Sequence, residues 1–179
     1  MGGWAYTSIE AEQLTTAEYY GKALHDLGEL HPEVVALTAD LAKSTKIAPF
    51  VKAFPERLIN VGIAEQNMFG IVAGLAKNGF IPYASTFSIF AAARSLDQIH
   101  TDICYQNVPV KILASHAGTS FGQAGSTHHA IIDLAVARSL PNMTVMCPAD
   151  GAEAYKLVMA SYSIPGPVYI RINRGFDES

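Results

Sequence analysis

Short runs rich in β-branched and other apolar residues alternate with longer helical segments along almost the whole chain. The expected strands are residues 34–40, 57–62, 81–86, 108–116 and 167–172, with a further β-rich segment at 143–150. The expected helices are residues 15–31, 46–54, 64–79, 87–105, 130–140 and 151–163. Strands joined by helices of this length form right-handed crossovers and a mostly parallel sheet. The pattern therefore predicts an α/β fold, a three-layer α/β/α domain with a doubly wound sheet.

Local signals mark two of the expected helix ends. Thr15 and Glu18 have the spacing of a capping box at the start of the first helix. Asn78 followed by Gly79 is typical of a helix that ends in a left-handed residue. Because such signals agree with the strand and helix alternation, they support the predicted element boundaries.

Composition limits the classes of function. The chain has 179 residues, 50% of them hydrophobic, which suits one domain with a sizeable core. We expect that domain to span residues 14–179, after a flexible arm at 1–13. A formal net charge of −4 argues against a nucleic-acid surface, which needs a basic stripe. No apolar run reaches the roughly 20 residues that span a bilayer, and two cysteines are too few for a disulfide framework. These features predict a cytoplasmic protein without a nucleic-acid or membrane partner.

In parallel α/β sheets, ligands bind beyond the carboxyl ends of the strands. Four places in this sequence meet that condition, namely Asp40, residues 62–65, residues 85–87 and the segment that starts at His116. The polar and aromatic side chains that could carry chemistry gather at the same places. The topology therefore predicts one site along that edge of the sheet.

Glu65 is a carboxylate in the first turn of a helix that is otherwise small and apolar. A helix N-terminus favours an acidic side chain by about 0.3–1 kcal/mol, which is one explanation. The other is functional, because Ile63, Ala64 and Met68 surround it in the sequence. If they desolvate the carboxyl group, its pKa rises and it can hold and pass a proton near neutral pH.

Phe87 and Phe90 are three residues apart and follow directly from an expected strand. On a helix this spacing puts both rings on one face. Aromatic pairs of this kind usually belong to the core. At the carboxyl end of a strand they could instead form the wall of a pocket for a flat heterocycle.

The loop from 115 to 130 is rich in glycine, histidine and hydroxyl side chains and lacks a hydrophobic period. Long polar loops in compact domains are often functional, although a mobile surface loop is the simpler alternative. His116, His128 and His129 lack tight zinc-ligand spacing. They suit a polyhydroxylated ligand better. Near the C-terminus, Arg171 and Arg174 form either a solvated strand edge or a phosphate contact.

Six segments, in this order and spacing, resemble the pyrimidine-binding domain of transketolase and its thiamine-diphosphate-dependent relatives. They are TAD (38–40), VGIAEQNM (61–68), YASTFSIF (83–90), ILASHAG (112–118), GSTHHAIIDLA (125–135) and YIRINRG (169–175). The best match is the second half of the split transketolases, a C-terminal section or second subunit. The resemblance implies the three-layer fold and a transferase that moves two-carbon ketol units between sugar phosphates.

The resemblance also implies roles at the cofactor. In this family a glutamate contacts ring nitrogen N1′ of the aminopyrimidine and relays a proton, and Glu65 occupies that position. Phe87 and Phe90 match the aromatic pocket for the pyrimidine, and Asp40 matches an aspartate at the cofactor site. The implied cofactor is thiamine diphosphate with Mg²⁺.

Three further residues match positions that contact the substrate in this family. His116 and His128 match catalytic histidines that contact sugar hydroxyls and the reacting oxygens, and Arg174 matches an arginine that binds the substrate phosphate. The chain departs from the family pattern at Ala93, where many members carry a third aromatic residue, and at Ala124, where an aspartate is usual. His129 stands where glutamine is frequent.

The family's magnesium- and diphosphate-binding pattern, GDG…N, does not occur in this sequence. We therefore expect no metal ligand in this chain, and a diphosphate-binding partner subunit that supplies the ligands of Mg²⁺. A homodimer or heterotetramer is expected, with diphosphate-binding and C-terminal domains absent from this chain and the isolated domain inactive. Two alternatives stay open: a deoxyxylulose-phosphate-synthase-like or other two-carbon transferase, and a non-catalytic assembly or regulatory module.

Overall fold

The computed structural model describes residues 14–174, so the predicted flexible arm at 1–13 lies outside the described residues. Within these residues, six strands form one sheet in the order β2-β1-β3-β4-β6-β5, and every neighbouring pair is parallel. The strands are β1 (Val34–Thr38), β2 (Leu58–Asn60), β3 (Ile81–Phe87), β4 (Lys111–Ser115), β5 (Thr144–Met146) and β6 (Val168–Arg171). The parallel, doubly wound sheet that the sequence predicts is confirmed.

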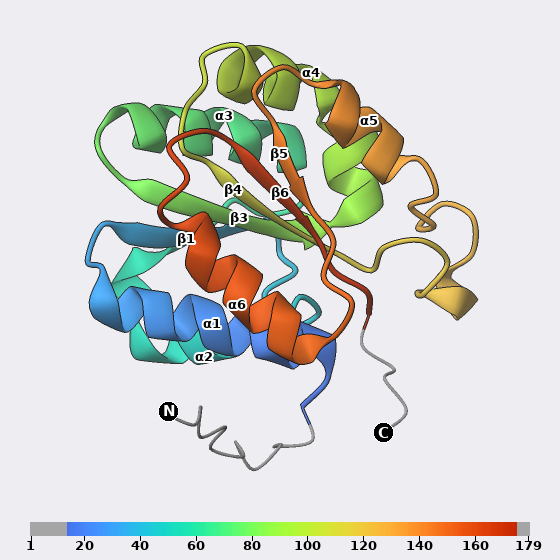
Figure 1. Cartoon of the computed structure of the whole chain (residues 1–179), viewed down its shortest axis with the longest axis horizontal. Coiled ribbons are helices and arrows are strands. Elements are labelled where there is room, and N and C mark those ends of the chain that lie inside the picture. The colour runs from blue at the N-terminus through green and yellow to red at the C-terminus, as the bar shows by residue number, and fades with distance from the viewer. Residues whose placement is uncertain (1–13, 175–179) are drawn as a thin grey trace, which may run out of the picture.

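Helices cover both faces of this sheet (Figure 1). On one face lie α1 (Thr16–Leu30), α2 (Ala48–Ala53) and α6 (Gly151–Ser161). On the other lie α3 (Glu65–Lys77), α4 (Leu96–Gln98), α5 (Asp133–Ser139) and the π-helical segments η2 (Phe90–Arg94) and η3 (Ile99–Cys104). Two short 3₁₀ turns, η1 (Pro55–Arg57) and η4 (Gly122–Ala124), complete the elements. The result is a three-layer α/β/α domain.

Alternating side chains of the central strands enter two separate cores. In β1, Val34 and Ala36 pack with α1 and α6, whereas Val35 and Leu37 pack with α3. All five residues of β1 and of β4 are buried, as expected of strands with helices on both faces. This double coverage explains why these strands are almost continuously apolar in sequence.

The helix ends follow the local signals. The Thr15 side chain accepts a hydrogen bond from the Glu18 amide, and the Glu18 carboxylate accepts one from the Thr15 amide, which confirms the capping box. Gly79 has a φ of 90°, in the left-handed region, as its place after α3 predicts.

The predicted helix at 87–105 is wrong at its start and in its regularity. Strand β3 continues through Phe87, and the following residues form π-helical segments around the short helix α4. Phe87 pairs with Ser115 in register, so the sheet extends one residue beyond the predicted strand end. π-Helical turns need no sequence signal of their own and often occur at functional sites.

Gly21 allows α1 to contact the loop that follows β1. A Cβ atom at this position would lie 2.0 Å from the carbonyl oxygen of Lys46, a backbone atom that has no rotamer to change. Helix and loop must therefore separate to accept any side chain.

We predict that Gly21→Ala lowers the free energy of unfolding by on the order of 1–3 kcal/mol, the usual cost of overpacking. Gly74→Ala is the matched control, because Gly74 lies in the interior of α3 with nothing within 4 Å of an added Cβ. That change should raise stability by up to about 1 kcal/mol through helix propensity. Urea unfolding of both variants measures the difference, and equal effects would contradict the close contact.

Candidate active site

The site lies at the carboxyl edge of the sheet, where the parallel register aligns the strand ends. Thr38 of β1 pairs with Ser85 of β3, and Phe87 pairs with Ser115 of β4. Next to β4 runs β6, which leads to Arg174. Because β1, β3, β4 and β6 are consecutive in the sheet, the segments after them share one edge.

Glu65 begins α3 and is buried, with 3% of its surface exposed. No side chain caps this helix at Ala64, so the acidic residue lies close to unpaired amides of the first turn. The surroundings differ from the sequence expectation, because Ile63 is 81% exposed and does not bury the carboxylate. The carboxylate instead forms an ion pair with Arg94, whose Nη1 donates to Oε2 at 2.9 Å.

Phe87 and Phe90 lie side by side, although they do not share a helix face. Phe87 is the last residue of β3, and Phe90 starts the π-helical segment η2. Their ring centroids are 5.4 Å apart and the rings are tilted by 33°. Phe87 is buried at 4% exposure, and Phe90 is half-buried. The Arg94 guanidinium lies over Phe90, with Cζ 3.9 Å from the ring centroid.

These two rings belong to a larger group that we call the aromatic cluster. Its members are Phe87, Phe90, His116, Phe121 and His128. Phe87 is central, at 4.1 Å from the His116 ring and 5.4 Å from the Phe121 ring between centroids. The structure thus brings two predicted histidines against the predicted phenylalanine pair.

His116 is held in a strained backbone conformation, with a φ of 58°. Its Nδ1 lies 2.9 Å from the Ser115 hydroxyl, and that hydroxyl is 3.4 Å from the Thr86 carbonyl oxygen. If the hydroxyl donates to Thr86, it accepts from Nδ1–H, and Nε2 keeps a lone pair. Burial, with a smaller effect of the nearby Arg174 and His128, lowers the pKa of His116 to about 4. The imidazole is therefore neutral at physiological pH and can accept a proton or hydrogen bond.

A cavity of about 510 Å³ borders the aromatic cluster, and we call it the cationic cavity. Its lining residues are Thr15, Lys43, Ser44, Lys46, His116, Phe121 and Arg174. The Arg174 guanidinium lies 4.8 Å from the Phe121 centroid, and its backbone amide donates to Ser120 Oγ. Lys46 forms an ion pair with Glu18, with Nζ 3.4 Å from Oε1. With two lysines and an arginine on its walls, this cavity suits an anionic group.

Asp40 lies apart from the aromatic cluster. The residue is exposed, and its backbone lies in the left-handed region, with a φ of 62°. Its amide donates to Asn60 Oδ1 at 3.0 Å, and Asn60 Nδ2 lies 3.4 Å from its carboxylate. The structure therefore places this predicted site residue at the ends of β1 and β2, with its carboxylate accessible from outside.

Arg171 and Arg174 have different surroundings. Arg171 Nε donates to the buried Asp133 carboxylate at 3.0 Å, and Asp133 also accepts from Tyr169. This contact links β6 to α5. Of these two arginines, only Arg174 contributes to the wall of the cationic cavity.

The sequence analysis missed three residues that help to form this site. Phe121 is an aromatic residue within a polar loop, and Arg94 follows Phe90 at the i+4 spacing that pairs side chains on helices. Both signals were visible. Lys43 gave no signal, since only the loop conformation after β1 carries it into the cationic cavity.

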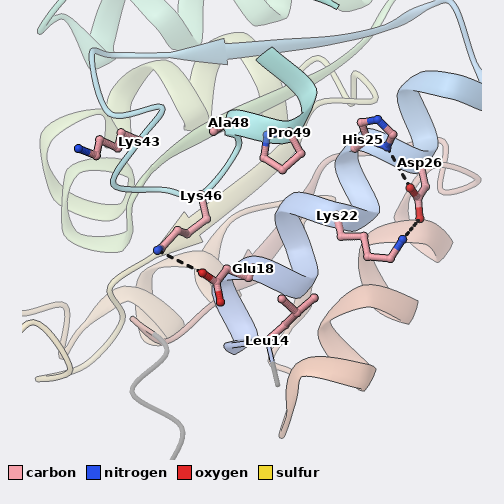
Figure 2. A pocket seen from close by; sticks show the side chains of 9 residues that line it. All are labelled: Leu14, Glu18, Lys22, His25, Asp26, Lys43, Lys46, Ala48 and Pro49. Atoms are coloured by element: carbon pink, nitrogen blue, oxygen red, sulfur yellow. Dashed lines mark hydrogen bonds and ion pairs between the residues drawn. The ribbon is translucent and has the colours of Figure 1, made fainter. Parts of the chain in front are cut away.

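A second cavity, of about 560 Å³, lies between α1 and the segment 43–49 (Figure 2). It shares Lys43 and Lys46 with the cationic cavity, and its far end is formed by Lys22, His25 and Asp26. The lysines meet carboxylates there, Lys46 with Glu18 and Lys22 with Asp26. None of the predicted catalytic residues lines this cavity.

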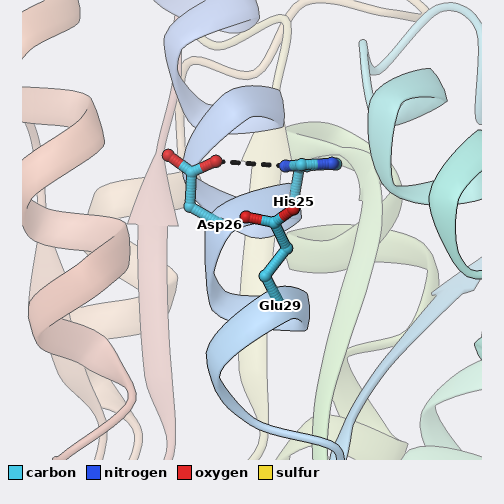
Figure 3. Close-up of side chains that lie close together, drawn as sticks. All are labelled: His25, Asp26 and Glu29. Atoms are coloured by element: carbon cyan, nitrogen blue, oxygen red, sulfur yellow. Dashed lines mark hydrogen bonds and ion pairs between the residues drawn. The ribbon is translucent and has the colours of Figure 1, made fainter.

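His25, Asp26 and Glu29 form a close group on α1 (Figure 3). His25 Nδ1 lies 3.1 Å from Asp26 Oδ1, and the other Asp26 oxygen accepts from Lys22 and Tyr155. The Asp26 carboxylate is thus already paired.

In the described part of the chain, no helix is long and apolar enough to cross a membrane.

The site residues fit a flat heterocycle that carries hydrogen-bond donors. A buried carboxylate, Glu65, stands beside an aromatic face, Phe90, and a guanidinium already occupies the space between them. A guanidinium is planar and cationic and stacks on rings, so the position accepts a planar donor group. The neutral His116 and the cationic cavity lie next to it.

Comparisons with known proteins agree with this geometry. Residues 12–176 match the family described as "Transketolase, pyrimidine binding domain". A protein of Methanocaldococcus jannaschii, provisionally named a transketolase C-terminal section, is 43% identical over 87% of this chain and 49% of its own length. A 1-deoxy-D-xylulose-5-phosphate synthase of Dictyoglomus turgidum is 42% identical over 90% of this chain and 26% of its own.

Among solved structures, one described as "Split gene transketolase, inactive beta4 tetramer" superposes with a TM-score of 0.82. It is 51% identical and covers 93% of this chain, which spans 53% of that protein. The chain therefore spans about half the length, or less, of the relatives that it matches.

We predict that His116 makes the stability of the domain depend on pH below neutrality. Its pKa falls from 6.5 to about 4 on folding. Between these values the unfolded chain binds more protons, so stability rises with pH across this window and is fully regained above pH 6.5. The slope from this group approaches about 1.4 kcal/mol per pH unit.

Urea unfolding between pH 4 and 7 measures the slope, and His116→Gln should flatten it. His100→Gln is the control, because His100 is exposed on η3. If both variants keep the wild-type slope, His116 is not the group that titrates.

Proposed function

We propose that this chain, which belongs to the family of transketolase pyrimidine-binding domains, forms one half of a thiamine-diphosphate-dependent active site. In this proposal the complete site transfers two-carbon ketol units between sugar phosphates. The observation that carries the proposal is the buried Glu65 carboxylate beside the Phe90 face, at the carboxyl edge of a parallel sheet.

Glu65 is proposed to hold the ring nitrogen of the cofactor's aminopyrimidine. Its burial excludes water from the carboxylate, so a proton shared with a bound ring nitrogen stays between the two groups. Phe87 and Phe90 would position the ring by offset stacking, worth about 0.5–1.5 kcal/mol beyond area burial. Thiamine diphosphate, when bound, supplies the electron sink for the two-carbon unit.

His116 and His128 are proposed to contact the substrate. Both rings belong to the aromatic cluster, and the neutral His116 can accept a proton from a sugar hydroxyl. Arg174 is proposed to bind the substrate phosphate within the cationic cavity, since a guanidinium matches phosphate oxygens in a bidentate way. Asp40 would contact the cofactor from the ends of β1 and β2, where its carboxylate is exposed.

A partner subunit is proposed to supply the remaining half, including the ligands of Mg²⁺ and of the diphosphate. Apolar side chains at the edge of the site support a partner surface, because Ile63 is 81% exposed and Ile131 is 76% exposed. The similar structure described as a split-gene transketolase in an inactive β4 tetramer supports a multimeric assembly that needs another chain for activity. A homodimer or a heterotetramer fits this proposal.

One observation favours a second candidate reaction. A 1-deoxy-D-xylulose-5-phosphate synthase is 42% identical over 90% of this chain, close to the value for the transketolase section. Ala124 lies in the loop of the aromatic cluster, where an aspartate is usual in transketolases. A synthase-like two-carbon transfer would use the same Glu65 and aromatic wall with a different donor.

We predict that Glu65→Gln abolishes ketol transfer, by 10²-fold or more, when this chain is combined with its partner, thiamine diphosphate and Mg²⁺. The amide keeps the size of the side chain but cannot share the proton. Glu29→Gln, on the exposed end of α1, is the matched control and should keep wild-type turnover. A coupled assay with a ketose phosphate donor measures both, and equal rates would remove Glu65 from the mechanism.

We predict that Arg174→Ala raises KM for phosphorylated sugars by 10-fold or more with little change in kcat, because it removes binding common to the ground and transition states. The KM for unphosphorylated sugars should not change, which distinguishes the loss of a phosphate contact from a general loss of activity. An equal loss for both kinds of sugar would contradict the phosphate role.

A further inference from the structure

Arg94 occupies the position that the proposed function assigns to the aminopyrimidine. Its Nη1 donates to Glu65 Oε2 at 2.9 Å, and its Cζ lies 3.9 Å from the Phe90 centroid. The two side chains differ in access, because the Glu65 side chain is 2% exposed and that of Arg94 is 45% exposed. The arginine therefore reaches in from the surface to a buried acid.

A guanidinium and a protonated aminopyrimidine present similar groups. Each is a flat, delocalised cation that offers an N–H group to a carboxylate, and each stacks on an aromatic face. Both would use the Glu65 carboxylate and the same face of Phe90. Two planar groups cannot lie on one ring face at van der Waals distance, so they exclude each other.

A cavity beside Arg94 can receive the displaced guanidinium. A cavity of about 610 Å³ lies beside Arg94, lined by Ala93, Arg94, Leu96, Asp97, His100, Ser139 and Leu140. Asp97 follows Arg94 at the i+3 spacing, and its carboxylate forms no ion pair within residues 14–174. The small side chain of Ala93 leaves this cavity open.

The segment that carries Arg94 also holds buried polar groups that this arrangement leaves unpaired. In the described part of the chain, three buried side-chain oxygens lack a hydrogen-bond partner, those of Thr86, Ser95 and Gln98. All three lie between β3 and η3, around the π-helical segment η2. Buried oxygens of this kind are rare, and a second arrangement of the segment could satisfy them.

We propose that Arg94 is an internal ligand of the cofactor site, which binds Glu65 in the unliganded chain and moves to Asp97 when an aminopyrimidine enters. This inference rests on the proposed function. Arg94 thereby holds the buried carboxylate paired until the cofactor arrives, and it competes with that cofactor. Ala93, which lines the receiving cavity, makes the movement possible.

The test is titration of the full chain with thiamine, which has the aminopyrimidine and lacks the diphosphate that a partner would bind. Binding is followed by NMR for the wild type, Arg94→Ala, Asp97→Asn and the double variant. We expect Arg94→Ala to bind thiamine 5-fold or more tightly than the wild type. Asp97→Asn should bind 3-fold or more weakly, and only in chains that keep Arg94.

Three further comparisons keep the test specific. Arg138→Ala removes one positive charge from exposed α5 and should leave thiamine affinity unchanged. Methylguanidine should bind to Arg94→Ala and not to the wild type, which shows that the vacated position is intact and takes a guanidinium. Arg94→Lys keeps the charge without the planar fork and should give an intermediate affinity.

Unchanged or weaker thiamine binding by Arg94→Ala would overturn the inference, as would an Asp97→Asn effect that persists without Arg94. In either case the proposed function is tested separately, by the Glu65→Gln assay with the partner chain. If no variant binds thiamine and Glu65→Gln keeps full turnover, both are wrong.

Discussion

Burial of both faces of a parallel sheet is the constraint on which the rest of this structure depends. Because every strand pair is parallel, all the carboxyl ends lie at one edge, and because helices cover both faces, that edge is where side chains can meet a ligand. The aromatic cluster and the cationic cavity both lie there. The register of β3 with β4, which pairs Phe87 with Ser115, sets the contact between Phe87 and His116.

The electrostatics of the site are divided between two kinds of environment. Glu65 is buried beside the Arg94 guanidinium, whereas burial, with a smaller effect of Arg174, lowers the pKa of His116 and keeps its imidazole neutral. Under the proposed function, the Glu65 carboxylate would relay a proton and the neutral His116 imidazole would accept one, so the two groups would not compete for the same proton.

Under the proposed function, the site is open toward a partner chain. Ile63 and Ile131 are exposed, and the chain spans about half the length of the relatives that it matches. The Arg94 contact gives this openness a physical consequence, since it pairs a carboxylate that would otherwise be buried alone in the unliganded chain. If the active site is divided between chains as proposed, this contact stabilises one half before assembly.

The sequence by itself determined the fold class, the order of the strands along the chain and the capping box at Thr15, and it placed the candidate residues Glu65, Phe87 and His116 after the carboxyl ends of strands. These follow from local periodicity and from the rule that ligands meet strand ends, which need no knowledge of distant contacts. Only the tertiary structure decided that Phe87 ends a strand, that Phe121 joins the aromatic cluster and that Arg94 reaches Glu65. Those contacts join residues far apart in sequence through π-helical turns and loop conformations, and no periodic pattern of side chains encodes such geometry.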